Sequence, residues 1–206
     1  MKILAVSDMV VDTLYSPKVA EYIQGIDCVL GCGDLPYEYL EFLISALNIP
    51  LFYVPGNHDP AYDEANPSSR VNGGTNLDCM VLKHKGLNIA GIGGSIRYKP
   101  GHANQYEQAQ MRRRLALFYP HLAWHLFQNG RILDLVIAHS PPMGIHDDND
   151  PAHVGFSSFN DFIRITQPRY FLHGHKANYK SNLEATTTQV GATTVINICP
   201  YRILEV

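Results

Sequence analysis

The sequence predicts an α/β fold in which parallel strands alternate with helices. Short apolar runs typical of buried strands alternate with segments whose apolar residues recur at helical spacing. The opening third follows the order strand, helix, strand, helix, strand, and strands joined by helices form a parallel sheet. Several apolar runs are followed directly by Asp, Asn or His. Because α/β proteins build their sites at the carboxyl ends of such strands, a functional site is expected there.

The elements of the first third follow from apolar runs and helical periodicity. Strands are predicted over residues 2–7, 28–32 and 51–54, and helices over residues 17–24 and 36–47. In the second helix, apolar residues fall at i, i+3, i+4 and i+7 from Leu40, and Pro36 suits the first helical turn. Residues 60–76 form a polar stretch rich in Gly and Pro. It exceeds an ordinary connection, which makes it a candidate rim for a site.

The rest of the chain continues the alternation and ends in strands. Pro120 is expected to interrupt a helix over residues 105–119, with a second helical piece to about residue 128. The tetrapeptide Ser158-Phe159-Asn160-Asp161 matches a capping box that opens another helix. The remaining predicted elements are a hairpin over 80–83 and 87–92, strands over 133–138 and 170–172, and antiparallel strands over 185–189, 195–199 and 201–206.

Composition favours one globular domain over residues 1–206. The chain is 46% hydrophobic and 17% charged, and its net charge of −3 argues against nucleic acid or an anionic membrane as a partner. No apolar run approaches the roughly 18 residues that span a bilayer, and the first apolar run is too short for a signal peptide. The four cysteines contain no C-x-x-C pair. We therefore expect a cytoplasmic protein with reduced thiols, and its oligomeric state stays open.

Four motifs place metal-binding side chains directly after predicted strands. They are Gly33-Asp34, Gly56-Asn57-His58-Asp59, Ala138-His139-Ser140-Pro141-Pro142 and Gly174-His175, and Asp8 follows the first strand in the same way. A lone Gly-Asp pair has no specificity, and a single His after a strand is more often structural. Motifs in this order at strand ends favour a metal site instead. Mixed oxygen and imidazole donors suit Mn, Fe, Zn or Ni better than Ca.

In order and spacing, these motifs resemble the calcineurin-like metallophosphoesterase superfamily, and the resemblance covers nearly the whole chain. It implies a four-layer α/β/β/α sandwich of mixed sheets flanked by helices. It also implies a phosphodiesterase or phosphomonoesterase that hydrolyses a small phosphate ester with metal-bound hydroxide. The implied cofactors are one or two ions of Mn, Fe, Zn or Ni.

The resemblance assigns the metal ligands residue by residue. Asp34 bridges two ions, and Asp8 belongs to the first of them. The second ion is held by Asp34 together with Asn57, His139 and His175, so its set of ligands is complete.

The resemblance also assigns two catalytic residues. His58 follows a metal-bound Asn and points into the site, where it stabilises the transition state or protonates the leaving oxygen. Asp59 is placed to orient the ring of His58 and raise its basicity. The alternative for Asp59 is a loop cap.

The chain departs from the family pattern at the first ion. Asp8-Met9-Val10 stands for the usual Asp-x-His, and Gly174-His175-Lys176-Ala177 stands for Gly-His-x-His, so two imidazoles are missing. Tyr37 is the most specific replacement, because purple acid phosphatases take a tyrosinate three residues after the bridging aspartate. Its alternative role is packing in the first helical turn.

Three histidines are weaker replacements: His146, His153 and His173. His173 precedes the Gly-His motif on a strand and should face away from His175. Around the site, Arg97, His102 and Asn104 could form a substrate rim with the loops over residues 60–76 and 141–155, or lie on ordinary surface loops.

The missing imidazoles leave two further functions open. One is a catalytically weak or inactive binding or scaffold protein, as the phosphoesterase-like subunit of retromer is. The other is a sensor of a metal or a nucleotide that uses the second ion site for binding alone. The complete second site and His58 favour hydrolysis over both, since a scaffold has no need of an unliganded imidazole beside a metal.

Overall fold

Two β-sheets lie face to face in the computed structural model, which describes residues 1–129, 133–176 and 186–206. From edge to edge, the first sheet contains β13 (Tyr201–Glu205), β1 (Lys2–Val6), β2 (Cys28–Gly31), β3 (Leu51–Tyr53) and β4 (Thr75–Asn76). The second contains β11 (Thr187–Val190), β12 (Thr193–Asn197), β10 (Tyr170–His173), β9 (Leu135–Ala138), β6 (Leu87–Ile92) and β5 (Met80–His84).

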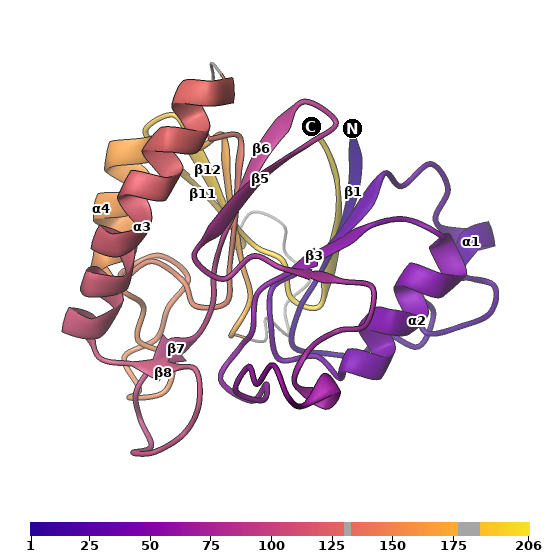
Figure 1. The fold of residues 1–206 in the computed structure, drawn as a ribbon, viewed down its shortest axis with the longest axis horizontal. Coiled ribbons are helices and arrows are strands. Elements are labelled where there is room, and N and C mark those ends of the chain that lie inside the picture. Colours follow the sequence, from indigo (N-terminus) through magenta and orange to yellow (C-terminus); the bar gives the residue numbers. More distant parts are fainter. Residues whose placement is uncertain (130–132, 177–185) are drawn as a thin grey trace.

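Helices cover the outer face of each sheet (Figure 1). The helices α1 (Val19–Tyr22) and α2 (Tyr37–Leu47) flank the first sheet, and α3 (Gln108–Asn129) and α4 (Ser157–Thr166) flank the second. Short elements complete the described chain: η1 (Pro67–Ser69), β7 (Ser95–Ile96) and β8 (Gln105–Tyr106). The layers are therefore α/β/β/α, which confirms the predicted sandwich of mixed sheets flanked by helices.

The alternation of side chains along each strand builds three apolar layers. In β1, Ile3 and Ala5 belong to the core between the sheets, whereas Leu4 and Val6 pack with residues of α1 and α2. The strands of the second sheet alternate in the same way between the inter-sheet core and the helices α3 and α4. Because both faces of each sheet are covered, the central strands are continuous apolar runs, as their sequences predicted.

The direction of the strands agrees with the sequence except near the C-terminus. The strands β1, β2 and β3 are parallel, and β5 and β6 form a hairpin around Lys85 and Gly86, whose φ angles of 45° and 86° suit a two-residue turn. The prediction that residues 195–199 lie in an antiparallel strand was partly wrong. Within the described residues, β12 runs antiparallel to β11 but parallel to β10. The strand β12 lies between β11 and β10 in the sheet, and it forms a hairpin with the edge strand β11.

The helix α3 differs from its prediction at its start and at its proline. It begins at Gln108, because residues 105–106 form β8, and it continues through Pro120 without interruption. A stripe of buried residues spaced at helical intervals packs on the second sheet and α4 on both sides of this proline: Met111, Leu115, Phe118 and Leu122. Tertiary packing therefore outweighs the local cost of the missing hydrogen bond.

The predicted capping box at Ser158 was wrong. The helix α4 begins at Ser157, its N-cap Phe156 makes no side-chain hydrogen bond, and the Ser158 hydroxyl is buried without a partner. The start of α4 is fixed instead from outside, because Gln108 Oε1 accepts hydrogen bonds from the Ser157 N–H and hydroxyl, both at 3.1 Å. Among the described residues, no helix has the length and apolar character needed to cross a membrane.

Replacement of the helix-interior proline tests this account of α3. Pro120→Ala is expected to raise the free energy of unfolding by about 1 to 3 kcal/mol, because the exposed ring is lost while the missing amide donor is restored. The matched control is Pro67→Ala at the start of η1, where a proline removes no helical hydrogen bond and the change should stay under about 1 kcal/mol. Urea unfolding measures both, and a destabilised Pro120→Ala protein would contradict the account.

Candidate metal site

The predicted ligands meet at one end of the sandwich, where the carboxyl ends of strands from both sheets come together. Asp8 and Asp34 follow β1 and β2 of the first sheet, and His139 and His175 follow β9 and β10 of the second. Asn57 lies in the loop after β3. Neither sheet alone contains a full set of ligands, so the site depends on the packing of one sheet against the other.

Four side chains converge around one ring nitrogen. The Nε2 atom of His139 lies 3.0 Å from Nδ1 of His175 and 3.0 Å from Oδ1 of Asn57. Its distance to Oδ2 of Asp34 is 3.3 Å. One ligand atom from each of Asp34, His139 and His175 lies within 4.8 Å of the others. The structure therefore brings together the set of side chains that the resemblance assigned to the second ion.

The outer nitrogens of the two imidazoles fix which atoms carry protons. His139 Nδ1 lies 2.8 Å from the carbonyl oxygen of Cys32, and His175 Nε2 lies 2.6 Å from the carbonyl oxygen of Ala152. A carbonyl oxygen only accepts, so each of these nitrogens donates an N–H. In the neutral rings, the facing nitrogens then both present lone pairs, which repel at 3.0 Å unless a cation lies between them.

The charges around His139 point to the same need for a cation. Burial by itself lowers the pKa of His139, but the carboxylates of Asp34 and Asp8 outweigh it and raise the pKa to about 9. Although burial opposes it, the interaction with His139 lowers the pKa of Asp34 to about 2. Burial and the neighbouring His139 lower the pKa of His175 to about 3. A proton on His139 or a metal ion would supply this charge, and the two compete.

The separations fit a transition metal. Two ligands with bonds of about 2.1 Å to one ion lie about 3.0 to 3.4 Å apart at octahedral or tetrahedral angles. The distances of 3.0, 3.0 and 3.3 Å around His139 Nε2 fall in this range. The carbonyl groups behind the rings are the outer partners that orient imidazole ligands in metal sites. Asp34, Asn57, His139 and His175 therefore fit the ion that the chain's motifs imply.

Tyr98 is a residue of the site that the sequence did not reveal. Its hydroxyl accepts a hydrogen bond of 3.1 Å from Nδ2 of Asn57, which directs Oδ1 of the amide toward His139. Tyr98 lies 41 residues from Asn57, on the loop between β7 and β8, and no local motif marks the contact. Its place in the Gly-rich stretch of the predicted rim was the only available signal.

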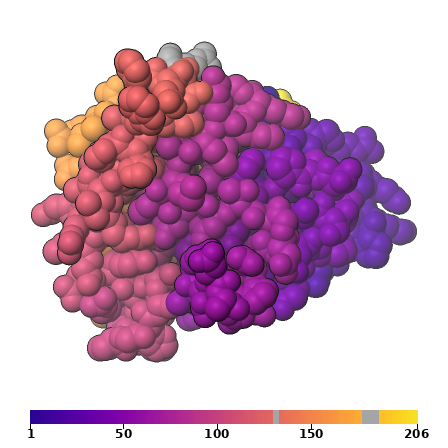
Figure 2. Space-filling view, viewed as in Figure 1, coloured from indigo at the N-terminus to yellow at the C-terminus, as the bar shows by residue number. Residues whose placement is uncertain are grey.

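The predicted rim residues have other contacts. Arg97 forms an ion pair with Glu107 at 3.1 Å, and His102 is exposed on the same loop. The Asn104 amide donates to the carbonyl oxygen of Asp59 at 3.0 Å, so it ties this loop to the one after β3. Figures 1 and 2 show the two loops side by side at the lower edge of the molecule. Of the described residues of the loop, Tyr98 lines the cavity at the ligands, and a rim role for the other three stays a prediction.

The motif glycines are needed because backbone and ligands approach closely. A Cβ at Gly56 would overlap the carboxylate of Asp34, and a Cβ at Gly174 would overlap Ser7 Oγ and the carboxylate of Asp8. Any larger residue at either position would therefore displace a predicted ligand. This contact explains why each of the two motifs begins with glycine.

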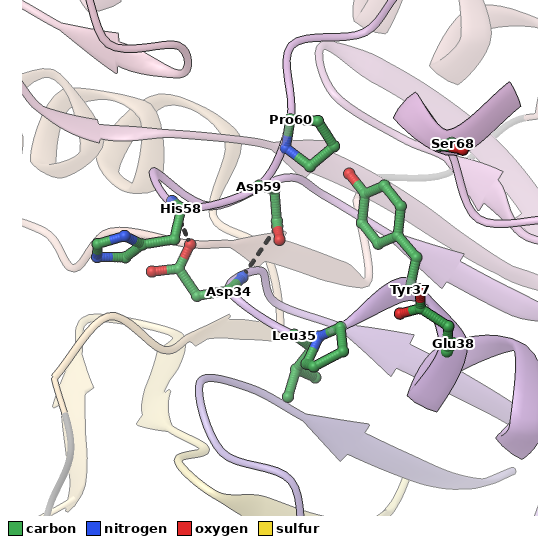
Figure 3. Close-up of a pocket in the computed structure, with 9 residues that line it drawn as sticks. Asp34, Leu35, Tyr37, Glu38, His58, Asp59, Pro60 and Ser68 are labelled. Carbon is green, nitrogen blue, oxygen red and sulfur yellow. Dashed lines mark hydrogen bonds between the residues drawn. The ribbon is translucent and has the colours of Figure 1, made fainter. Parts of the chain in front are cut away.

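Asp59 anchors two loops of the site. Its Oδ2 accepts hydrogen bonds from the backbone N–H groups of Asp34 at 2.9 Å and Gly56 at 2.7 Å. Burial raises the pKa of this carboxyl to about 6, against the effect of those two donors. The structure thus shows the loop-cap role for Asp59. In Figure 3 the His58 ring extends away from Asp59, and an influence of Asp59 on that ring stays a prediction.

The ligands open onto two cavities that share His58 and Asp34. A cavity of 590 Å³ is lined by Asp8, Asn57, Tyr98, His153 and His175, among others. A second cavity of 390 Å³ lies beside it, toward Leu35, Tyr37 and Pro60 (Figure 3). The backbone N–H of His58 donates to Oδ1 of Asp34 at 2.8 Å, which fixes the residue while its exposed ring remains available between the two spaces.

Tyr37 lies in the second cavity and packs edge-on against Tyr53, with ring centroids 5.8 Å apart. In Figure 3, Asp59 lies between the Tyr37 ring and the Asp34 carboxylate, and the Tyr37 hydroxyl is directed toward Pro60. Burial raises the pKa of the phenol, and the nearby Asp59 adds to the shift. This position agrees with the packing alternative, and metal ligation by Tyr37 stays a prediction.

The predicted first ion site is present only in part. Asp8 has a left-handed backbone with φ 63°, burial raises its pKa, and its carboxylate accepts the His175 N–H at 3.0 and 3.1 Å and the Ser7 hydroxyl. Val10 is 38% exposed and brings no donor, and residue 177 lies outside the described residues. His173 meets His146 at 3.0 Å. Strand alternation, the reason for expecting it to face away from His175, does not apply, because β10 ends at His173 and His175 has φ 66°.

An α/β/β/α sandwich with imidazole, carboxylate and amide ligands where its two sheets meet defines a metallophosphoesterase fold. A sequence model of the calcineurin-like phosphoesterases matches residues 1–179, and the chain belongs to this family. The uncharacterized protein MJ1162 of Methanocaldococcus jannaschii is 28% identical over 175 residues, which cover 79% of this chain and 73% of that protein. The crystal structure of TT1561 of Thermus thermophilus has a TM-score of 0.63 at 20% identity, covers 95% of this chain and 88% of that chain, and shows likeness of fold alone.

A methyl group at Gly56 tests the close approach of its loop to Asp34. Gly56→Ala is expected to weaken Mn²⁺ binding about 10- to 100-fold, because the new Cβ displaces the carboxylate. The control is Gly86→Ala in the turn between β5 and β6, which has open space but a φ of 86°, so it should lose about 1 kcal/mol of stability and keep its metal affinity. Calorimetric titration with Mn²⁺ measures both, and equal affinities in the two variants would contradict the prediction.

Proposed function

We propose that this protein is a metal-dependent hydrolase of small phosphate esters, either a phosphodiesterase or a phosphomonoesterase. One observation carries the proposal: Asp34, Asn57, His139 and His175 converge on one point, and the exposed His58 lies beside them at a cavity. A structural metal site would be closed by its ligands and would have no need of a free imidazole at its edge. Membership of the calcineurin-like phosphoesterases supports the same reaction class.

The ligands and their outer partners would hold the metal and set its surroundings. When bound, a Mn, Fe, Zn or Ni ion would polarise the phosphoryl group and acidify a coordinated water. Asp34 keeps its carboxylate ionised, since its pKa is about 2, and the carbonyl groups behind His139 and His175 keep both rings oriented. The Tyr98 hydroxyl accepts from Nδ2 of Asn57, which leaves Oδ1 of the amide on the side of the ion. These contacts build a preorganised site before substrate arrives.

The two cavities suggest how a phosphate ester would lie. The phosphate belongs in the 590 Å³ cavity with Asp8 and the metal ligands, and the organic group belongs in the 390 Å³ cavity beside it. His58 lines both, so its ring is placed to protonate the oxygen that joins them when the ester bond breaks. Leu35, Pro36 and Tyr37 give the second cavity an apolar wall, while Asp59 and Glu38 make it unsuitable for an anionic group.

A chromogenic assay tests the hydrolase proposal. The wild-type protein with added Mn²⁺ is expected to hydrolyse nitrophenyl phosphate or bis(nitrophenyl) phosphate and to lose this activity with EDTA. Asp34→Asn should reduce the rate about 100-fold or more, because it removes the carboxylate that lies 3.3 Å from His139 Nε2 and that the proposal assigns to both ions. Asp161→Asn, a substitution of an exposed aspartate in an ion pair on α4, is the matched control and should leave the rate unchanged. An inactive wild type, or activity that survives in Asp34→Asn, would overturn the proposal.

The second candidate function is a binding protein without catalysis. It is favoured by the first ion site, where Val10 supplies no donor and Asp8 is engaged by Ser7 and the backbone of His175. Such a protein would bind metal at Asp34, Asn57, His139 and His175 and would fail the assay above. Metal content and hydrolysis measured on one sample therefore separate the two functions.

The leaving group tests the assignment of His58. His58→Ala should lower kcat for an alkyl phosphate ester about 100- to 10,000-fold, because the alcohol departs poorly without a proton. The same variant should hydrolyse a nitrophenyl ester at close to the wild-type rate, because the acidic nitrophenol departs unprotonated. Metal content should stay unchanged, since His58 is no ligand in the proposal. If both esters slow equally, His58 does not act on the leaving oxygen.

A further inference from the structure

The first ion site lacks a nitrogen ligand among the residues that the sequence places there. Asp8 and Asp34 line one cavity, but Val10 has no donor atom. Two carboxylates fall short of the three or four protein ligands that hold a catalytic transition metal. A side chain from elsewhere in the fold has to complete the site if a second ion binds.

His153 enters this cavity from the loop between β9 and α4. It lines the cavity together with Asp8, Asp34 and His175, and its ring centroid lies 5.1 Å from that of His175. The neighbouring residue fixes the loop to the site, because the Ala152 carbonyl oxygen accepts the hydrogen bond from Nε2 of His175 at 2.6 Å. The loop and the ligand His175 are therefore positioned by one contact.

Asp150 orients the His153 ring. Its carboxylate oxygens lie 2.8 and 2.9 Å from Nδ1 of His153, so in the tautomer of the neutral ring that makes this contact Nδ1 carries the proton and Nε2 presents a lone pair. Oδ1 of Asp150 also accepts the backbone N–H groups of Ala152 at 2.9 Å and His153 at 3.2 Å. A carboxylate behind an imidazole is the usual partner that orients a histidine ligand and raises its basicity.

His146, His173 and Lys176 make contacts with other residues instead. His173 and His146 contact each other, and His146 Nε2 also meets Thr188 Oγ1 at 2.9 Å. Lys176, which follows His175, pairs with Asp148 at 2.9 Å. Of the described histidines that line the cavity, His58 has the predicted catalytic role and His175 belongs to the second ion. His153 is the one whose role is still unassigned.

We propose that His153, held by Asp150, supplies the imidazole of the first ion site, so that Asp8, Asp34 and His153 bind a divalent transition metal such as Mn²⁺. The inference rests on the metal site of the proposed function and does not require that the protein hydrolyse a phosphate ester. In this proposal, the imidazole that is missing at Val10, after β1, is replaced by one from the loop over residues 147–155. Among the described residues, the ligand atoms that lie within 4.8 Å of one another belong to Asp34, His139 and His175, so the His153 side chain, which is 40% exposed, would move toward Asp8 and Asp34 when the first ion binds.

Metal stoichiometry tests the assignment directly. Wild-type protein titrated with Mn²⁺ in a calorimeter is expected to bind two ions per chain. The electron paramagnetic resonance spectrum of this sample should show magnetic coupling between the two Mn²⁺ ions. His153→Ala should bind one ion without coupling. Asp150→Asn keeps an oxygen for the loop N–H groups but removes the charge behind the ring, so it should weaken one of the two ions about 10- to 100-fold.

The matched control is His121→Ala, an exposed histidine on α3, which should keep two coupled ions. A wild type that binds one ion, or a His153→Ala protein that binds two with unchanged affinity, would overturn the assignment. Thermal unfolding of each variant shows whether a loss of metal follows a loss of fold, and Asp150→Asn provides the test if His153→Ala is unstable. If the wild-type protein binds two coupled ions but hydrolyses no ester, the proposed hydrolase function is wrong and the assignment of His153 stands.

Discussion

The facing ring nitrogens of His139 and His175 are the contact on which the rest of the site depends. Each ring donates its outer N–H to a backbone carbonyl group, so two lone pairs meet at 3.0 Å in a buried setting. With the carboxylate of Asp34 and the amide oxygen of Asn57 alongside, this arrangement requires a positive charge at its centre. A proton on His139 is one solution, and a metal ion that satisfies all four donors is a better one.

The sandwich provides this contact by joining two sheets at one end. The inter-sheet core sets the separation of β2 from β9, and His139 at the end of β9 reaches the carbonyl oxygen of Cys32 after β2. A shift of one sheet along the other would separate the imidazoles from Asp34. Asp59 ties the loops after β2 and β3 together through the backbone N–H groups of Asp34 and Gly56. Core packing and loop contacts therefore hold the ligands in register as one connected network.

The apolar runs and helical periodicity of the sequence predicted the alternation of strands and helices, and the resemblance of its motifs to the calcineurin-like phosphoesterases predicted the layers of the fold and the ligands of the second ion. Apolar runs and helical periodicity are local signals, and the motif residues stand directly after strands, where side chains of neighbouring strands must meet. Local signals failed where packing decided the outcome. Pro120 lies inside α3 because buried residues on both sides hold the helix, and Ser158 lies inside α4 because Gln108 fixes the start of that helix.

Only the tertiary structure decided which distant residues line the site. Tyr98 and His153 reach the cavity from loops whose path no sequence pattern fixes, and Asp59 proved to bind backbone groups of two separate loops. The substitution at Val10 is visible in the sequence, but its consequence depends on whether another imidazole lies within reach. These contacts join residues that are far apart in the sequence, so they depend on the path of the loops in the folded chain and not on a local sequence pattern.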